Sequence, residues 1–418
     1  MSWLILGAGR SGMGAKKLLE SSGQSAFLYD ENTKYGSMPN LIFHPDHPIF
    51  NEKDLTFVVS PGFPPQHTIL KRAKDLGLKV ITEIDLALEH FRGTLIAVTG
   101  TNGKSTTVMM ISHLLKSKTI DHSVGGNIGI AASSLMIEKP SLLVLELSSY
   151  QLESSHKIAP HVAVITGIAP DHQSRHGTME AYLASKWRIF EKQSSSDFAI
   201  IEKNAYNMAL SMNLKKPEAN VILLDKHHVN FPRIRNFSWK HDCLNALFSA
   251  HAVSKLLKID AESLLVSFEN FVGLPHRCQI IGRRNGYRII NDSKSTTMDS
   301  TIHALSDLNG QVTLFLGGLS KGEEFKQIAE FRHTIASIVA FGPTSAQIAR
   351  DLASYVPVFC FTNLKAATEA LPNIMETLRG DLLFSPACPS QDEFSDFEER
   401  GTFFTNACSP FLENLGCL

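Results

Sequence analysis

The sequence contains a loop whose residue types are suited to binding a nucleoside triphosphate, G-T-N-G-K-S-T at residues 100–106. It follows an apolar run at 95–98 and precedes a helical pattern at 108–115. In such a loop the backbone N–H groups hold phosphate oxygens, the lysine neutralises the β- and γ-phosphates, and the hydroxyl binds Mg2+. The usual G-x-x-x-x-G-K-[ST] pattern has a further glycine where this chain has Val98. The loop predicts an ATP-type site that uses Lys104 and Ser105.

A second glycine loop, G-A-G-R-S-G-M-G at residues 7–14, follows the apolar run 4–6 and opens a helical pattern. Asp30 follows 23 residues after Gly7, at the end of another apolar run. Such glycines let backbone N–H groups and a helix N-terminus approach a diphosphate, and the aspartate can accept a hydrogen bond from a ribose or sugar hydroxyl. The alternative is a turn that only packs helix against strand. The pattern indicates a diphosphate site without specifying the nucleotide.

A carboxylate, Glu146, ends the apolar run 142–146. A parallel sheet would bring this strand end beside the loop at 100–106, where a carboxylate can bind the metal ion of a nucleotide. The alternative is an ordinary surface carboxylate at a strand end.

Lys186 interrupts an apolar helical face that also contains residues 182, 183, 189 and 190. Burial disfavours the charged ammonium, and the neutral amine can add carbon dioxide to become a carbamate, an anion suited to Mg2+. The alternative is a lysine whose stem covers apolar surface while its ammonium reaches water.

Short apolar runs that end in polar or glycine residues recur along the chain, and most precede a helical pattern. They lie at residues 4–6, 57–59, 95–98, 142–147, 162–165, 289–290, 312–316 and 382–384. This alternation predicts an α/β fold with parallel sheets, in which ligands bind at the C-terminal ends of the strands.

Two junctions, near residues 82–92 and 273–275, divide this pattern into three parts. We expect three domains, at residues 1–82, 83–273 and 274–418, of which the first contains the diphosphate-type loop and the second the ATP-type loop.

The composition is that of an ordinary globular protein, with 418 residues, 43% hydrophobic and 19% charged. Forty Lys and Arg against 41 Asp and Glu give a net charge of −1, which argues against the broad basic face that nucleic-acid binding requires. The six cysteines form no C-x-x-C pair or zinc spacing and are expected to be reduced. Neither a signal peptide nor an apolar run of about 18 residues is found, so we expect a cytoplasmic protein without membrane insertion.

Several segments together resemble the Mur ligases, ATP-dependent amide-forming enzymes of peptidoglycan precursor synthesis. They are the loop at 100–106, G-N-I-G at 126–129, L-E-L-S-S-Y-Q-L-E at 145–153, D-H at 171–172, L-P-H-R at 274–277 and N-D-S-K at 291–294. The run S-P-A-C-P-S-Q-D-E-F at 385–394, with Phe397 and Arg400-Gly401, resembles the branch that adds D-glutamate to UDP-N-acetylmuramoyl-L-alanine. The D-N-P-R tetrad of the diaminopimelate- or lysine-adding branch is absent from the sequence.

The resemblance implies a monomeric cytoplasmic ligase that uses ATP and two Mg2+ ions, and that takes UDP-N-acetylmuramoyl-L-alanine and D-glutamate as substrates. ATP would transfer its γ-phosphate to the substrate carboxylate, and the amine would attack the resulting acyl phosphate. The matching catalytic positions are Lys104, His172, Lys186, Arg277 and Lys294. Those for ATP are Gly100, Thr101, Asn102, Gly103, Lys104, Ser105, Thr106, Asn245, Arg277 and Asp292.

The resemblance also implies a Rossmann-like UDP-sugar domain at residues 1–82, a P-loop ATP domain at 83–273 and a Rossmann-like, amino-acid-binding domain at 274–418. The remaining positions concern the two substrates and the metal ions. The resemblance implies that the UDP-sugar contacts Gly9, Ser11, Gly12, Asp30, Ser60, Gly62, Asn127 and Ser148. It implies that D-glutamate contacts Thr296, Lys321, Ser390 and Phe397, the last two mainly through backbone atoms. It implies that Mg2+ binds Ser105, Glu146, His172 and carbamylated Lys186.

Some of these positions also fit roles that involve no ligand. His172 can be a surface residue and Lys321 a solvated loop lysine. Ser174 stands where the family usually has aspartate, and Trp239 and Asp242 replace a glycine and an asparagine of the segment that contacts adenine. A helix start with Asp242 as N-cap accounts for that segment nearly as well.

One local pattern in the last part of the chain predicts a helix. Ser390 and Glu393 have the spacing of a capping box, which predicts a helix N-terminus able to receive a glutamate carboxylate.

Two other classes of function are considered. One is a sister ligase for another amino acid, or a folylpolyglutamate-type enzyme. The other is a dinucleotide- or NTP-binding protein without ligase activity.

Overall fold

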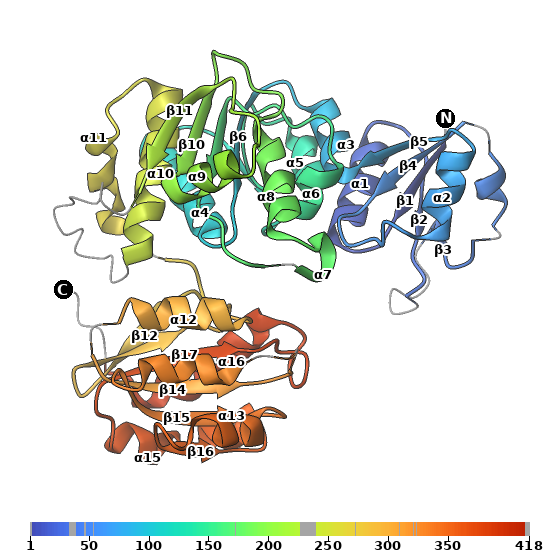
Figure 1. The fold of residues 1–418 in the computed structure, drawn as a ribbon. Helices are drawn as coiled ribbons and strands as arrows, with labels where there is room; N and C mark the ends of the chain where they lie inside the picture. Colours follow the sequence, from blue (N-terminus) through green and yellow to red (C-terminus); the bar gives the residue numbers. More distant parts are fainter. Residues whose placement is uncertain are drawn as a thin grey trace. The chain divides into compact units, whose positions relative to one another are not determined.

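The computed structural model of the 418-residue chain describes residues 2–32, 39–45, 47–52, 54–171, 173–225, 240–271, 273–308, 310–320, 322 and 324–413. The chain divides into two compact units, residues 1–271 and 272–418. The first unit contains two sheets and the second contains one (Figure 1). The predicted boundary at residue 82 falls between β5 and α3 inside the first unit and stays a prediction.

The first sheet has five parallel strands in the order β3-β2-β1-β4-β5. The strands are β1 (Ser2–Leu6), β2 (Ala26–Tyr29), β3 (Leu41–Ile42), β4 (Leu55–Val59) and β5 (Lys79–Thr82). The helices with them are α1 (Arg10–Ser21) and α2 (Thr68–Asp75), with the 3-10 turn η2 (Pro48–Asn51). The order reverses between β1 and β4, so the loops after these two strands meet at the point where ligands of such sheets bind.

The second sheet has six parallel strands in the order β11-β10-β9-β6-β8-β7. The strands are β6 (Thr94–Thr99), β7 (Ser123–Gly126), β8 (Leu142–Glu146), β9 (Val162–Ile165), β10 (Phe198–Glu202) and β11 (Asn220–Leu224). The α-helices are α3 (Glu83–His90), α4 (Lys104–Ser117), α5 (Ala132–Leu135), α6 (Ser149–Ser154), α7 (Gln173–His176), α8 (Met179–Trp187), α9 (Lys203–Ser211), α10 (Lys240–Leu257) and α11 (Glu262–Leu265). Short 3-10 turns occur at η3 (Met136–Glu138), η4 (Arg188–Phe190) and η6 (Val266–Asn270).

Separate apolar cores lie on the two faces of this second sheet, because alternate residues of β6 and β8 point in opposite directions. One core contains Leu95 and Ala97 and continues into residues of the first sheet such as Ile5. The other contains Ile96 and Val98 and is covered by α4 and α10. The central strands β6, β8 and β9 are mostly apolar because the sheet is buried on both faces there.

Helix α3 is attached to the second sheet by two buried carboxylates. Glu83 accepts hydrogen bonds from the backbone N (2.7 Å) and Oγ (2.5 Å) of Ser133, and burial raises the pKa of Glu83. Asp85 accepts bonds from Ser155 Oγ and from two backbone N–H groups in the turn that follows α6. These bonds fix α3 to the elements that carry residues 126–151.

The sheet of the second unit has the order β12-β13-β17-β14-β15-β16, and β12 alone runs antiparallel to its neighbour. The strands are β12 (Gln279–Arg284), β13 (Tyr287–Asn291), β14 (Val312–Gly317), β15 (Ile335–Phe341), β16 (Val358–Cys360) and β17 (Asp381–Ala387). The helices are α12 (Met298–Ser306), α13 (Ser345–Leu352), α14 (Leu364–Glu369), α15 (Leu371–Glu376) and α16 (Phe397–Cys408), with 3-10 turns η7 (Phe325–Phe331) and η8 (Ser409–Phe411). Stacked rings of Phe384 and Phe404, with centroids 4.1 Å apart, attach α16 to the sheet.

The expected α/β fold is confirmed: seven of the eight apolar runs lie within strands, and the run 142–147 extends one residue past the end of β8. One alternative and one prediction drawn from local patterns are wrong. Asp242 lies within the first turn of α10 and not at an N-cap. No helix begins at Ser390, and the next helix, α16, starts at Phe397. The Glu393 side chain accepts a hydrogen bond from the backbone N of Leu364 instead of capping a helix at Ser390. Among the described residues no helix combines the length and apolar character needed to cross a bilayer.

Candidate active site

The first glycine loop is held tightly against the ends of β1 and β4. Gly7 has a positive φ of 97°, and a Cβ on Gly12 would lie 1.8 Å from the Gly7 carbonyl oxygen. Ser60 Oγ donates to the same carbonyl oxygen at 3.3 Å. Asp30 Oδ2 accepts from the Ala8 backbone N at 2.7 Å. The glycines and Asp30 therefore shape the loop itself.

A cavity of about 490 Å3 opens beside this loop. Its lining residues come from the first glycine loop, the end of β2, the loop after β4, and the region from the end of β7 to α6. They are Gly7, Gly9, Arg10, Ser11, Asp30, Glu31, Ser60, Pro61, Gly62, Phe63, Pro64, His67, Gly126, Asn127, Gly129, Ala131 and Gln151. Six of the eight positions expected for the UDP-sugar lie in this lining; Gly12 is buried beneath the loop, and Ser148 lines a second cavity.

The second glycine loop forms the turn between β6 and α4. Gly100 and Gly103 have φ values of 145° and 80°, and α4 starts at Lys104. Lys104 Nζ donates to the carbonyl oxygens of Gly100 (3.0 Å) and Thr101 (2.7 Å). Val98 is fully buried within β6, paired with Glu146 of β8. The departure at position 98 therefore lies in the strand and not in the turn.

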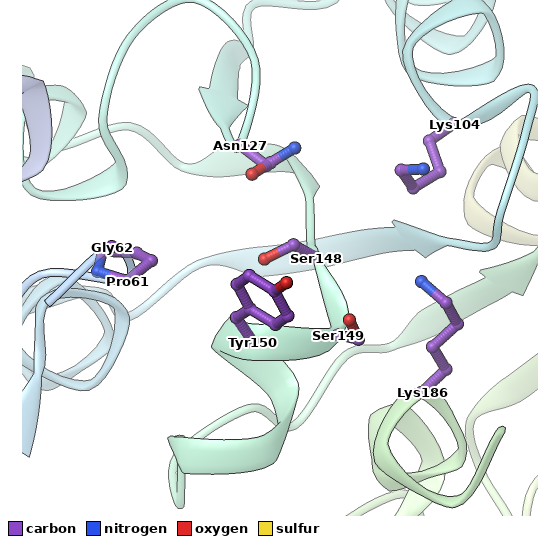
Figure 2. Close-up of a pocket in the computed structure, with 8 residues that line it drawn as sticks. All are labelled: Pro61, Gly62, Lys104, Asn127, Ser148, Ser149, Tyr150 and Lys186. Carbon is purple, nitrogen blue, oxygen red and sulfur yellow. The ribbon is translucent and has the colours of Figure 1, made fainter. Parts of the chain in front are cut away.

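A cavity of about 330 Å3 lies between the loop after β4 and the start of α4 at the P-loop. It is lined by Pro61, Gly62, Lys104, Asn127, Ser148, Ser149, Tyr150 and Lys186. Figure 2 shows Pro61 and Gly62 on one side, Lys104 and Lys186 on the opposite side, and Ser148 and Tyr150 between them. Three residues, Pro61, Gly62 and Asn127, line both cavities.

Glu146 joins the wall of this second cavity to the P-loop. Its carboxylate is 3% exposed and accepts from Ser105 Oγ (2.5 Å) and Asn127 Nδ2 (2.9 Å). A hydroxyl and a carboxylate side by side are oxygen donors of the kind that Mg2+ prefers, so these two residues fit a magnesium ion. Within the described ranges no three His, Cys, Asp or Glu side chains form a metal cluster. His172 lies outside the described residues.

Lys186 is 2% exposed, and its Nζ donates to Gly100 O at 2.8 Å. The ammonium also lies 4.7 Å from the centre of the Tyr182 ring. Burial, and next the positive charge of Lys104, lower the pKa of Lys186 from 10.5 to about 7. The predicted burial of this lysine is confirmed, and a substantial fraction of its amine is neutral near pH 7.

Two further residues shape the P-loop. Asn245 of α10 accepts from Thr107 Oγ1 at 3.3 Å, and its Oδ1 would lie 2.5 Å from a Cβ added to Gly103. Thr101 Oγ1 pairs with the hydroxyl of Tyr182 at 3.2 Å. The sequence predicts Asn245 beside the nucleotide, whereas it identifies Tyr182 only as one of the apolar-face positions.

In the second unit, some of the residues expected at the site lie on two segments that a buried arginine, Arg400, holds together. The guanidinium of Arg400 donates to Ser293, to the Cys388 carbonyl oxygen and to the Pro389 carbonyl oxygen. Burial lowers the pKa of Arg400 to about 10. These bonds hold the loop after β13 against the turn after β17. The carbonyl groups that accept them, at residues 388 and 389, directly precede Ser390, where the helix was wrongly predicted to start.

Three expected residues lie on these two segments. Asp292 accepts from Ser385 Oγ and from the Cys278 backbone N. Lys294 Nζ lies 4.9 Å from the ring centre of Phe397. Ser390 is buried, and within the described part of the chain its Oγ has no hydrogen-bond partner. Lys321 lies outside the described residues, while Arg277 and Thr296 lie in loops of the same unit.

Sequence reasoning missed several residues of these sites. Ser149 and Tyr150 line the second cavity beside Ser148, and the L-S-S-Y motif contained the signal for both. Arg10 lines the first cavity from a position of the glycine pattern that any residue can occupy. Arg400 stands out in the sequence only as part of a motif, because a sequence does not reveal which arginine is buried.

Comparison with known proteins identifies relatives over the whole chain. A family model described as Mur ligase middle domain matches residues 98–265, and one described as Mur ligase, glutamate ligase domain matches residues 276–385. A protein of Aquifex aeolicus named UDP-N-acetylmuramoylalanine--D-glutamate ligase is 34% identical over 417 residues, which cover 97% of each chain.

Two solved structures share the fold. UDP-N-acetylmuramate-alanine ligase from Thermotoga maritima aligns with a TM-score of 0.59 and 17% identity, over 98% of this chain and 99% of that one. MurF ligase from Thermotoga maritima, in complex with ADP, aligns with a TM-score of 0.59 and 14% identity, over 98% of this chain and 95% of that one. At these identities the likeness concerns the fold alone.

Proposed function

The chain belongs to the Mur ligase family, and from this premise we propose that it joins D-glutamate to UDP-N-acetylmuramoyl-L-alanine in peptidoglycan precursor synthesis. Members of the family are ATP-dependent amide-forming ligases, so the chain is an ATP-binding enzyme of that class. The choice of D-glutamate is supported by the name of the Aquifex aeolicus relative and by the run at 385–401. We further propose that the enzyme acts as a cytoplasmic monomer, which analytical ultracentrifugation of the purified chain and fractionation of cells test.

One observation carries the proposal: the cavity at the diphosphate-type loop and the cavity at the P-loop share Pro61, Gly62 and Asn127. A nucleotide sugar whose diphosphate lies at the first loop therefore has a route for its carboxylate toward Lys104 and Lys186. A protein that only bound a dinucleotide would have no use for the second cavity, whereas a ligase needs the carboxylate and the γ-phosphate in the same place.

The P-loop residues supply charge where the phosphoryl group is transferred. We assign Lys104 to the β- and γ-phosphates, since its ammonium already lies over the loop that would hold them. The substrate carboxylate attacks the γ-phosphorus, ADP leaves, and the product is an acyl phosphate. Neutralising the negative charge that gathers on these oxygens is the main contribution that a protein can make to such a step.

Ser105 and Glu146 would hold Mg2+, together with a carbamate on Lys186 and with His172. The ion, when bound, supplies positive charge to the phosphate oxygens. Lys186 favours carbamate formation because its buried amine has a lowered pKa and can attack carbon dioxide. The carbamate replaces a buried cation with an anion beside Lys104.

The second unit would bind the amino acid and complete the amide bond. The amine of D-glutamate attacks the acyl carbonyl carbon, and collapse of the tetrahedral intermediate releases phosphate. We assign Thr296, Ser390 and Phe397, with Lys321, to the glutamate, and Lys294 to the developing charge. Ser390 supports this assignment, because a buried hydroxyl without a partner in the described residues is suited to meeting a ligand atom.

The test is release of phosphate from ATP by the purified chain. We expect release to depend on both UDP-N-acetylmuramoyl-L-alanine and D-glutamate, with mass spectrometry identifying the amide product. Lys104→Ala should abolish it, whereas Lys116→Ala, on the last turn of the same helix, should not. Release that proceeds equally without either substrate contradicts the proposal. Preference for L-alanine, diaminopimelate or L-glutamate in a competition assay assigns the enzyme to a sister activity.

A further inference from the structure

Arg10 is a charged residue that the glycine pattern does not explain. It occupies a variable position of the first loop, where the pattern requires only glycines for close backbone approach. It is the first residue of α1, its side chain is exposed, and it lines the 490 Å3 cavity. Its NH1 donates to Gly129 O at 3.2 Å. The side chain thus reaches from one wall of the cavity to the other.

The charges around this cavity are unevenly distributed. Among the described residues of its lining, Arg10 is the one side chain with a permanent positive charge, and Asp30 and Glu31 are the two carboxylates. Both carboxylates follow β2, and both have donors already: Asp30 accepts from two backbone N–H groups, and Glu31 accepts from the Tyr29 hydroxyl at 2.8 Å. Glu31 also pairs with His67 at 3.2 Å. Because Asp30 lies against the glycine loop itself, the two charges that distinguish positions in the cavity are those of Arg10, which attracts a dianionic ligand group, and Glu31, which repels it.

We propose that the Arg10 guanidinium binds the diphosphate of the nucleotide sugar and sets the direction in which the ligand lies in the cavity. This inference rests on the proposed function, because it takes a UDP-sugar as the ligand. A guanidinium has five N–H donors, and Gly129 O is the acceptor that it contacts in the described structure, so most of its donors remain for phosphate oxygens.

The direction follows from the charges and from the shared lining. With the diphosphate at Arg10, the nucleoside lies toward the aromatic wall of Phe63 and His67, whose ring centroids are 4.8 Å apart. The sugar and its lactyl peptide then extend past Asn127 into the second cavity. The reverse orientation would place the two phosphate charges beside Glu31.

The contact with Gly129 also gives Arg10 a second partner on the loop that carries Asn127. That loop has a positive φ of 60° at Gly129 and is held by a hydrogen bond from Gly126 N to Ile130 O at 2.8 Å. The guanidinium that binds the phosphate is therefore itself held by the opposite wall of the cavity. Arg10 thus positions both the ligand and the loop that carries Asn127.

The test compares ligands that differ only in phosphate, using the full-length chain. Dissociation constants for uridine, UMP and UDP are measured by calorimetry for the wild type, Arg10→Gln and Arg10→Lys. We expect Arg10→Gln to weaken UDP binding by about 10-fold or more while uridine changes less than about 2-fold, because a charge-assisted, bidentate contact is lost. Arg10→Lys should recover part of the loss as a point charge. The wild-type affinity for UDP should fall with added salt more steeply than that of Arg10→Gln.

A matched control is Arg92→Gln. Arg92 is also exposed, and its guanidinium donates to backbone carbonyl oxygens, but it lies outside both cavities. It should leave all three dissociation constants unchanged. Steady-state kinetics add a second readout: in Arg10→Gln the KM for the UDP-sugar should rise by a much larger factor than kcat falls, and the KM for ATP should not move.

Equal weakening of uridine and UDP binding, with circular dichroism unchanged, would mean that Arg10 acts only through the shape of the loop and would overturn the inference. Unchanged UDP binding in Arg10→Gln would overturn it as well. The two proposals fail separately, since a wild-type chain that binds UDP but makes no amide with D-glutamate contradicts the proposed function and leaves the Arg10 comparison valid.

Discussion

At the scale of single residues, the most informative feature is the pair of lysines that share one carbonyl oxygen. Lys104 and Lys186 both donate to Gly100 O, at 3.0 and 2.8 Å. Two ammonium groups so close together repel one another, and burial adds to the disadvantage of the inner one. Either a neutral amine or a carbamate at Lys186 relieves the repulsion, so the local electrostatics favour modification at this residue.

Replacing Lys186 tests whether the anion matters. We expect Lys186→Ala to lower kcat by roughly 100- to 1,000-fold, since one charged group at the phosphoryl-transfer site is lost. Short carboxylates such as acetate should restore part of the activity by occupying the space of the carbamate. The measurement is the phosphate-release rate with increasing acetate, and Lys192→Ala, an exposed lysine nearby in sequence, is the control. A well-folded Lys186→Ala that acetate does not rescue argues against a carbamate.

The pH dependence of the modification follows from the lowered pKa of Lys186. The amine is mainly protonated below about pH 7 and mainly neutral above it. Only the neutral amine attacks carbon dioxide, so the carbamate content should rise between pH 6 and pH 8. With 13C-labelled bicarbonate, NMR of the wild type should show a carbamate signal that grows over this range and is missing in Lys186→Ala. A lysine of ordinary pKa would instead require a much higher pH.

Spacing predicted the burial of Lys186, because an apolar stripe reveals which face of a helix is buried. The position of Glu146 was predictable for a similar reason, since strand ends in a parallel sheet meet at one edge. The contact of Arg10 with Gly129 was not predictable, because 119 residues separate the two and no local pattern connects them.

At the scale of elements, the contact between α1 and α5 fixes the two walls of the first cavity relative to one another. A Cβ added to Gly14 would lie 2.5 Å from Ser134 Oγ and 2.7 Å from Ser133 Oγ. Ser133 has little freedom to move, because its backbone N and hydroxyl both donate to buried Glu83. A glycine at position 14 thus serves packing between helices, in addition to any role in the loop.

Gly14→Ala should therefore destabilise the protein by about 1–3 kcal/mol, as overpacking of a fixed contact does. The control is Gly310→Ala, at a site with open space around it and no positive φ, which should change stability by less than about 0.5 kcal/mol. Urea unfolding followed by circular dichroism measures both. Equal midpoints for Gly14→Ala and the wild type would show that α5 shifts freely.

The helix wrongly predicted at Ser390 illustrates how tertiary contacts override a local pattern. The spacing of Ser390 and Glu393 satisfies a capping box, but Glu393 accepts from the Leu364 backbone N of α14. Arg400, 1% exposed, takes the carbonyl oxygens of Cys388 and Pro389. Leu364 is distant from Glu393 in sequence, and a sequence does not reveal that Arg400 is buried. Local propensity alone therefore could not exclude the helix.

At the scale of the whole molecule, the alternation of strands and helices predicted three α/β parts, and the structure contains three sheets. The order of the strands within each sheet was not predicted from the sequence. The near-zero net charge of −1 gave no sign of anionic ligands. The positive charges that would bind them, such as Arg10 and Lys104 at the first positions of α1 and α4, are few, and an average over 418 residues conceals them. The two cavities that share a wall were also beyond prediction, since they depend on how the first two sheets pack.

Ligand binding should be visible in the stability of the full chain. At a concentration of about 100 times its dissociation constant, UDP should raise the unfolding free energy by about 2.7 kcal/mol, because it binds only the folded state. Differential scanning fluorimetry should record a transition midpoint that rises with UDP concentration. Inorganic phosphate at the same concentration is the control and should raise it less. A midpoint that UDP does not move would contradict a nucleotide site in this protein.

The wall shared by the two cavities has a consequence for inhibitor chemistry. Two weak fragments, one at Arg10 and Phe63 and the other at Lys104 and Tyr150, would occupy adjoining spaces separated only by Pro61, Gly62 and Asn127. Joining them by a short tether makes the second binding event intramolecular, with an effective concentration on the order of millimolar for a short flexible linker. The tethered compound should bind far more tightly than either fragment, and rigid linkers that follow the Asn127 wall should gain the most.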